Sequence, residues 1–321
     1  MKRLFGVCVA VLFVIGAVAS VQAADNLVLA TGGTAGTYYP FGGAMAKIWS
    51  KIKDMNVTAQ TSGASGENIR LINKKEVELA LVQSDTLDQA WNAVESFKPK
   101  EGEKPAPLRG MAAVAVLYPE IVQVVVRADS PIKTFADLKG KKVGVGAPGS
   151  GTEINFRQLM DIYGLKKEDI NGQYLSYSES AEAFKDKHID AFIATAGIPN
   201  SAIMDVSTQN EIRILPIPSD VSGKLIEKYP FFAGVKVPAN TYKGLTADVP
   251  TVAVNAVLIA GTQLKEDMVY NLTKTLFENQ ADLASAHAKG KELNSQYAVK
   301  GVSIPYHPGA VKYFKEKGLM K

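Results

Sequence analysis

The stretch LVLATGGTAGTYYP, residues 27–40, places a short apolar run directly before a turn rich in glycine and threonine. Residues 27–31 have the composition of a buried strand, since most of them are aliphatic. Pro40 suits the first turn of a helix, because the amide proton that proline lacks would have no partner there. This stretch therefore predicts a strand, a tight turn and a helix over about 41–53.

The same order of strand, small-residue turn and helix is repeated further along the chain. We expect repeats at 57–75, 143–163 and 174–187, and additional strands at 79–82 and 191–194. Short β-branched runs that alternate with helical patterns are typical of α/β proteins with parallel sheets. The sequence therefore predicts an α/β fold.

Serine residues mark the expected starts of two helices in the second half of this pattern. Ser150 and Glu153 fit the S-x-x-E capping box, in which each side chain bonds the backbone amide of the other residue. Ser178 is expected to be the N-cap of the helix that follows it.

Two longer apolar runs indicate that the chain crosses twice between two lobes. These runs are 121–126 and 252–260, and the segment after the second run is expected to be helical. If that segment packs back on the first lobe, lobe 1 comprises residues 24–120 and 252–321. Lobe 2 then comprises residues 121–251. A chain of this length is long enough to build two domains.

Residues 1–23 have the three parts of a secretory signal peptide. Lys2 and Arg3 are positive, residues 4–19 are apolar, and small residues precede the expected cleavage point near Ala23. The apolar run is shorter than the roughly 20 residues that a membrane-spanning helix needs. We therefore expect an exported, periplasmic protein.

Composition narrows the chemistry that the exported chain can perform. Cys8 is the one cysteine and lies in the predicted signal, so neither a disulfide nor a thiolate metal site is expected. Loss of Lys2 and Arg3 with the predicted signal lowers the formal net charge from +4 to +2, and this near-neutral balance gives no support for nucleic-acid binding, which favours a concentrated basic face. The three histidines do not have metal-ligand spacing. We expect a monomer without metal or cofactor.

Glycine, serine and threonine gather at the predicted carboxyl ends of strands in both lobes. The segments concerned are 32–38, 62–65, 83–85, 149–152 and 195–197. Ligands of parallel α/β sheets bind at these ends, next to helix N-termini whose amide groups have no internal partner. Such amides and hydroxyls favour a small anion, above all a carboxylate.

Any one of these turns is also explained by helix capping or by a tight bend. Their recurrence in both predicted lobes favours a cleft that both lobes line. Tyr38 and Tyr39 lie between the glycine turn and Pro40, and at least one of them is expected to contact the ligand. We assign that contact to Tyr38.

Several segments together resemble the TAXI family, the extracytoplasmic solute receptors of TRAP transporters. The resemblance rests on TGGTAGTYYP at 31–40, TSGAS at 61–65 with Asn68, and LALVQSD at 79–85. FADLKGKKV at 135–143 and PGSGT at 148–152 are similar as well, and the first of these is common to many type II periplasmic binding proteins.

The resemblance implies a two-lobed periplasmic-binding-protein fold of type II with a hinge between the lobes. It also implies a TRAP membrane subunit as partner, driven by an ion gradient rather than ATP, and glutamate, glutamine or a 2-oxoglutarate-like dicarboxylate as ligand. Gly66 departs from the bulkier residue expected in many relatives, which affects the shape of the pocket. The expected ligand-binding residues are Thr34, Thr37, Tyr38, Ser62, Asn68, Gln83, Ser150, Gly151 and Thr152, to which the last strand-end turn adds Gly197.

Two other classes of protein remain alternatives at this point. A secreted hydrolase would use Asp85 and His307 as an acid–base pair, which requires the two side chains to lie within hydrogen-bonding reach. An adhesin or surface antigen would have a cleft that does not respond to small molecules.

Overall fold

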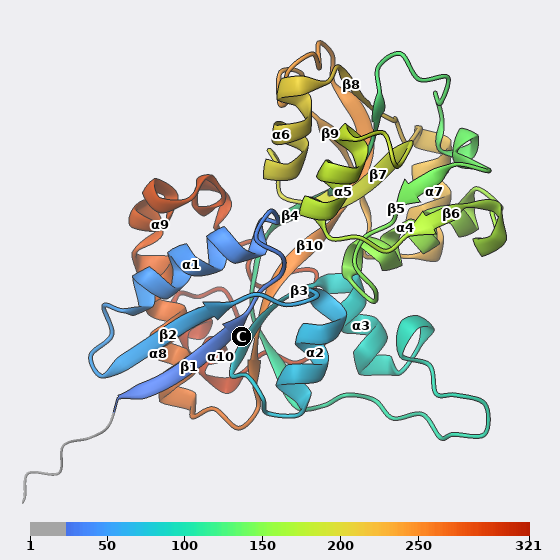
Figure 1. Cartoon of the computed structure of the whole chain (residues 1–321). Helices are drawn as coiled ribbons and strands as arrows, with labels where there is room; N and C mark the ends of the chain where they lie inside the picture. The colour runs from blue at the N-terminus through green and yellow to red at the C-terminus, as the bar shows by residue number, and fades with distance from the viewer. Residues whose placement is uncertain (1–23) are drawn as a thin grey trace, which may run out of the picture.

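The computed structural model describes residues 24–321, and the predicted signal peptide lies outside them. These residues form two lobes that are joined by two long strands, β4 and β10 (Figure 1). The strands are β1 Asp25–Ala30, β2 Met55–Gln60, β3 Leu79–Gln83, β4 Met111–Arg127, β5 Lys142–Gly144, β6 Asn171–Gln173, β7 Ala191–Ala196, β8 Ile212–Ile214, β9 Ala233–Val237 and β10 Val249–Gly261. The α-helices are α1 Tyr38–Trp49, α2 Ser65–Asn73, α3 Ser84–Asn92, α4 Gly151–Ile162, α5 Tyr177–Lys185, α6 Ser201–Gln209, α7 Ser219–Lys228, α8 Glu266–Glu278, α9 Gln280–Ala286 and α10 Pro308–Glu316. Short 3₁₀ helices are η1 Glu95–Phe97, η2 Phe135–Leu138, η3 Lys167–Asp169 and η4 Ala288–Glu292.

The strands form one mixed sheet in the order β2-β1-β3-β10-β4-β7-β5-β6, with β8 beside β4 and β9 beside β10. In one lobe β2, β1 and β3 are parallel, and in the other β6, β5 and β7 are parallel. Every residue of β3 and β7 is buried, as expected for strands that helices cover on both faces. The α/β prediction is confirmed.

The two long strands pass from one lobe into the other. The first part of β4 pairs with β10, and its second part pairs with β7 through the register Ile121 to Ala196. Register shifts interrupt the β4–β10 ladder next to Ala256, and such irregularities bend and twist a strand. The predicted crossings at 121–126 and 252–260 are therefore only parts of longer strands.

Buried apolar side chains divide into separate cores for the two lobes. Two clusters draw their buried members from 27–118 and 256–314, and two others draw theirs from 121–254. The C-terminal helices pack against the N-terminal ones; the indole Nε1 of Trp49 in α1 donates to the Leu272 carbonyl of α8 at 2.9 Å. The proposed division into 24–120 with 252–321, and 121–251, stays a prediction, because residues 252–254 pack in the cores of lobe 2 and the lobe 1 cores resume at Ala256.

Two predicted boundaries are wrong near helix starts. The helix expected over 41–53 begins three residues earlier, at Tyr38. Ser178 is not an N-cap: Ser176 caps α5, accepting from the Glu179 amide at 3.3 Å, and Glu179 accepts from the Ser176 amide at 2.8 Å. This reciprocal pair needs an acidic residue three positions after the cap, which Ser176 has and Ser178 lacks.

No helix within residues 24–321 is long and apolar enough to span a bilayer.

Candidate functional site

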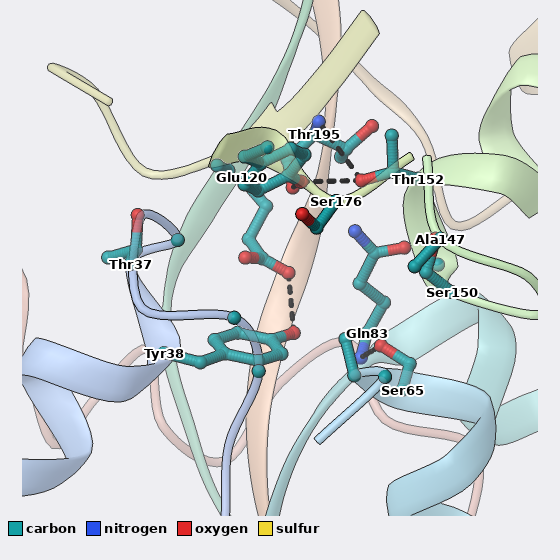
Figure 2. A pocket seen from close by; sticks show the side chains of 18 of the residues that line it. Thr37, Tyr38, Ser65, Gln83, Glu120, Ala147, Ser150, Thr152, Ser176 and Thr195 are labelled. Atoms are coloured by element: carbon teal, nitrogen blue, oxygen red, sulfur yellow. Dashed lines mark hydrogen bonds between the residues drawn. The ribbon is translucent and has the colours of Figure 1, made fainter. Parts of the chain in front are cut away.

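A cavity of about 80 Å³ lies between the lobes, where small and polar side chains from both of them meet (Figure 2). A cavity of this kind at strand ends is the usual ligand site of α/β sheets. Its lining residues are Gly32, Gly33, Gly36, Thr37, Tyr38, Ser62, Gly63, Ala64, Ser65, Gln83, Glu120, Ala147, Ser150, Gly151, Thr152, Ser176, Tyr177, Thr195 and Ala196.

The helices α1 to α5 all begin at this cavity. Tyr38 and Ser65 are the first residues of α1 and α2, and Gln83 is the N-cap of α3. Ser150 and Ser176 are the N-caps of α4 and α5 on the other lobe. Because the first amides of a helix have no internal partner and lie at its positive end, these termini together favour a bound anion.

Local sequence determines how these termini are held. Ser150 is the N-cap of α4, as predicted, because its Oγ accepts from the Glu153 amide at 3.2 Å. The amides that precede Glu153 in the first turn have no capping side chain. Ala64, the N-cap of α2, has φ of 67°, a left-handed conformation that costs energy in a non-glycine residue. Such backbone strain is often found at ligand sites.

Most of the predicted ligand residues line the cavity. Both lobes contribute to this set, which consists of Thr37, Tyr38, Ser62, Gln83, Ser150, Gly151 and Thr152. Tyr38 is 6% exposed and faces the cavity, whereas Tyr39 is 36% exposed at the surface. Among the two tyrosines, Tyr38 is therefore the one placed to meet a ligand.

Three predicted ligand residues lie outside the lining. Thr34 is exposed at the surface of the glycine turn. Asn68 is fully buried, and its Nδ2 donates to the carbonyls of Thr31 and Leu81 at 2.6 and 2.7 Å, so it ties two strand ends together. Gly197 is buried behind the lining and accepts from the Thr37 Oγ1 at 3.4 Å, a contact between the lobes.

Glu120 is the most consequential residue that sequence reasoning missed. It projects from β4 into the cavity between Tyr38 and Gln83, with an exposure of 2% (Figure 2). The Tyr38 hydroxyl donates to its Oε2 at 2.7 Å. Burial raises the pKa of the Glu120 carboxyl to about 8, although the hydrogen bonds from Tyr38 and Gln83 oppose that shift.

The wall on the side of lobe 2 includes Tyr177 and Thr195, two polar residues that the prediction did not contain. The Thr152 Oγ1 and the Tyr177 hydroxyl lie 2.5 Å apart, and the Tyr177 hydroxyl also contacts the Thr195 carbonyl at 2.8 Å. Within residues 24–321, the buried Gln83 Oε1 and Thr195 Oγ1 have no hydrogen-bond partner. Buried polar atoms rarely stay unpaired, so these two are available to a ligand or a water molecule.

The lobes touch each other around the cavity. The Asn155 Nδ2 of α4 donates to the Asp85 Oδ2 of α3 at 2.8 Å, and both side chains are buried. The Ser201 Oγ donates to the Ala35 carbonyl at 2.8 Å on another side. A Cβ at Gly66 would overlap the Gly149 carbonyl oxygen. The backbones of the two lobes therefore meet at two residues that have no side chain.

Asp85 and His307 have separate surroundings. Asp85 pairs with Asn155, and burial raises the pKa of its carboxyl to about 6. His307 is the N-cap of α10, where its Nδ1 accepts from the Gly309 amide at 3.2 Å. No hydrogen bond joins these two side chains among the described residues, so the pair that the hydrolase alternative requires is not formed.

Residues 24–321 contain no group of three or more His, Cys, Asp or Glu side chains that could hold a metal ion.

Comparison with known proteins supplies a family and several relatives. The sequence profile of the NMT1-like family matches residues 29–318. The putative aliphatic sulfonates-binding protein of Escherichia coli K12 is 32% identical over 104 residues, which cover 32% of this chain and 31% of that protein. That match therefore spans less than half of the curated relative.

Solved structures extend the likeness over nearly the whole chain. A periplasmic transporter has a TM-score of 0.56 at 14% identity and covers 94% of this chain and 99% of its own. A protein from Bordetella bronchiseptica RB50 has a TM-score of 0.54 at 16% identity, covering 92% and 89%. A putative L-cystine ABC transporter from Listeria monocytogenes has a TM-score of 0.52 at 14% identity, covering 84% and 98%. The predicted two-lobed periplasmic-binding-protein fold is confirmed.

Proposed function

The chain belongs to the NMT1-like family, and on that premise we propose that it is a solute-binding receptor that captures a small anion between its two lobes and delivers it to a membrane transporter. The signal-like residues 1–23 support export to the periplasm. No covalent chemistry is part of this proposal.

The observation that carries the proposal is the convergence of helix N-termini from both lobes on one cavity. In the part of the chain that the structure describes, the lining includes neither lysine nor arginine nor histidine. An anion there would be held by amides and hydroxyls, and a hydrogen bond to a charged group contributes about 1.5–3 kcal/mol. Several such bonds suffice for a tight receptor.

We propose a small carboxylate as the ligand: glutamate, glutamine or a 2-oxoglutarate-like dicarboxylate. The hydroxyl groups and first-turn amides that line the cavity support an acid group as the part of the ligand that is recognised. The relative in Escherichia coli is named for aliphatic sulfonates, which present a comparable oxyanion. A sulfonate is therefore the second candidate to be measured.

The proposed ligand-binding residues come from both lobes, so binding and closure are linked. Ser62, Tyr38 and Gln83 lie on lobe 1, and Ser150 to Thr152 lie on lobe 2. Only a closed form brings both sets to one ligand, and a ligand that prefers this form shifts the equilibrium toward it. Hinge motion about β4 and β10 is the proposed route.

We expect a small acid to bind the purified protein with release or uptake of heat in a calorimetric titration. The panel comprises L-glutamate, L-glutamine, 2-oxoglutarate, succinate and ethanesulfonate, and it is repeated with the double variant S150A/T152A. We expect that variant to weaken binding by about tenfold or more, since two hydroxyl donors are lost. Silence from every acid in the panel would contradict the proposed function.

The partner is proposed to be a TRAP membrane subunit, on the strength of the resemblance in residues 31–85. A solved structure with the same fold is named as an ABC transporter, so the two classes need a direct comparison. In membrane vesicles that contain the transporter, we expect uptake to follow an imposed ion gradient in the absence of ATP. Uptake that requires ATP would contradict the TRAP assignment and leave the receptor function in place. The receptor itself is proposed to act as a monomer.

A further inference from the structure

A carboxyl group is an unexpected side chain to find in the wall of a cavity that is built for an anion. Among the lining residues of the described chain, Glu120 is the one whose side chain can carry a full charge near neutral pH. If its carboxylate were ionised, it would repel a bound acid at close range, and burial would strengthen that repulsion because water is excluded.

The surroundings of Glu120 favour the neutral acid. The Tyr38 hydroxyl and the Gln83 amide are neutral donors, and neither provides a counter-charge. Lys289 of η4 is nearby, but its Nζ pairs with the Glu292 Oε1 at 2.6 Å, so its charge is largely matched by another carboxylate. Asp85 adds a second negative charge that disfavours ionisation of Glu120. The titratable and charged groups that influence Glu120 are thus Tyr38 of α1, Asp85 of α3, Tyr118 of β4, Tyr177 of α5 and Lys289 of η4.

We propose that Glu120 links anion capture to the uptake of one proton, because the occupied cavity holds Glu120 as the neutral acid. This inference rests on the proposed function and adds a specificity-determining residue to its site. The proton comes from solvent and resides on the Glu120 carboxyl, and no bond of the ligand is made or broken. With Glu120 neutral, the bound anion is not repelled by a carboxylate in the cavity wall. A state in which the anion is bound and Glu120 is also ionised is therefore disfavoured.

The direction of the pH effect follows from the raised pKa of about 8 in the empty cavity. Below that pH Glu120 is already protonated, so an anion enters without proton uptake. Above it, each binding event must first protonate Glu120, and the competent fraction of the protein falls. Between pH 6 and pH 9 the affinity for an anion is therefore expected to decrease by about tenfold.

The test is calorimetric titration with the amine-free acids of the panel, 2-oxoglutarate and ethanesulfonate, which do not themselves titrate between pH 6 and pH 9. Each is measured in two buffers with different heats of ionisation, so that the number of protons exchanged is obtained. We expect uptake of about one proton per bound anion at pH 9 and none at pH 6. Glu120→Gln should remove this uptake and bind at pH 9 about tenfold more tightly than the unmodified protein.

The control variant is Glu103→Gln, which removes an exposed carboxyl in the loop after η1 and should keep the pH dependence of the unmodified protein. Proton uptake that persists in Glu120→Gln, or an affinity that is equal at pH 6 and pH 9, would overturn the proposal. A third outcome would also overturn it: only L-glutamate binds, and Glu120→Gln abolishes that binding at both pH values. Glu120 would then be an ionised partner of the ammonium group of the ligand. That last result would leave the receptor function intact, whereas failure of every acid to bind would remove both proposals.

Thermal unfolding gives a second measurement that needs no ligand. A carboxyl whose pKa is raised by folding stabilises the native state at low pH, and this contribution is lost as pH rises through the folded-state value. The unmodified protein should therefore lose more stability between pH 5 and pH 9 than Glu120→Gln does. Identical pH profiles for the two proteins would show that Glu120 is ionised in the native state and would contradict the proposal.

Discussion

Replacing Gly66 by alanine is expected to weaken ligand binding by about tenfold or more while leaving the fold intact. Gly66 lies in the first turn of α2 on lobe 1, directly opposite Gly149 of lobe 2. An alanine Cβ would overlap the Gly149 carbonyl oxygen and lie 3.3 Å from the Gly149 carbonyl carbon. Backbone atoms cannot rotate away, so the added methyl group would hold the lobes apart and reduce the closed fraction.

The matched control for this prediction is Gly43→Ala in α1. A Cβ at Gly43 meets nothing within 4 Å, and alanine is the better helix former there by up to about 1 kcal/mol. Affinities from calorimetry and unfolding temperatures are compared for the two variants. Unchanged affinity in Gly66→Ala, with a stability equal to that of Gly43→Ala, would show that ligand capture does not require the lobes to approach as they do here.

Trp49→Ala is expected to lower the free energy of unfolding by about 3–5 kcal/mol, the largest effect on stability that we predict. Trp49 is fully buried in the core of lobe 1, and its indole donates to the Leu272 carbonyl of α8. The substitution removes the packing of a large side chain and leaves that carbonyl without its donor. It therefore tests whether the C-terminal helices belong to lobe 1, as proposed.

Trp91→Ala provides the comparison, because Trp91 of α3 is partly exposed and its ring stacks against the Arg109 guanidinium at the surface. We expect a loss of about 1 kcal/mol there. Denaturation in urea, followed by circular dichroism, gives both values. Equal losses for the two tryptophans would mean that α1 and α8 do not share a tightly packed core.

The sequence predicted the fold class because the alternation of strands and helices is a strong local signal. Residues 27–40 contain the turn that begins α1, and the strand-end position of Gln83 and Ser150 follows from the same pattern. The cavity at strand ends is a general consequence of parallel sheets, and seven of the ligand candidates line it.

Three ligand candidates lie outside the lining for identifiable physical reasons. The family pattern predicts a ligand contact for Asn68, but a side-chain amide can also bond backbone groups, and the Asn68 amide bonds the carbonyls of Thr31 and Leu81. Thr34 lies in the right turn but on its outer side, and a turn's orientation depends on tertiary contacts that its sequence does not specify. Gly197 contributes a carbonyl to the contact between lobes instead of lining the cavity.

Glu120 was missed although the sequence contains a signal for it. It is the one acidic residue in the long apolar run of residues 111–126, where burial of an unpaired charge would be costly in free energy. The sequence analysis predicts a strand for residues 121–126 alone, so Glu120 falls at the end of the predicted first lobe and outside that strand. A buried carboxyl in the middle of a strand that joins two lobes deserves to be considered as a site residue.

The central claim is that amides and hydroxyls from both lobes hold one acid group in the shared cavity. A crystal structure of the protein with its tightest ligand from the panel tests this most directly. We predict that the acid group lies about 2.7–3.1 Å from first-turn amides of both α2 and α4, next to Glu120. An acid group bound to one lobe alone, or at a place outside the cavity, would contradict the account.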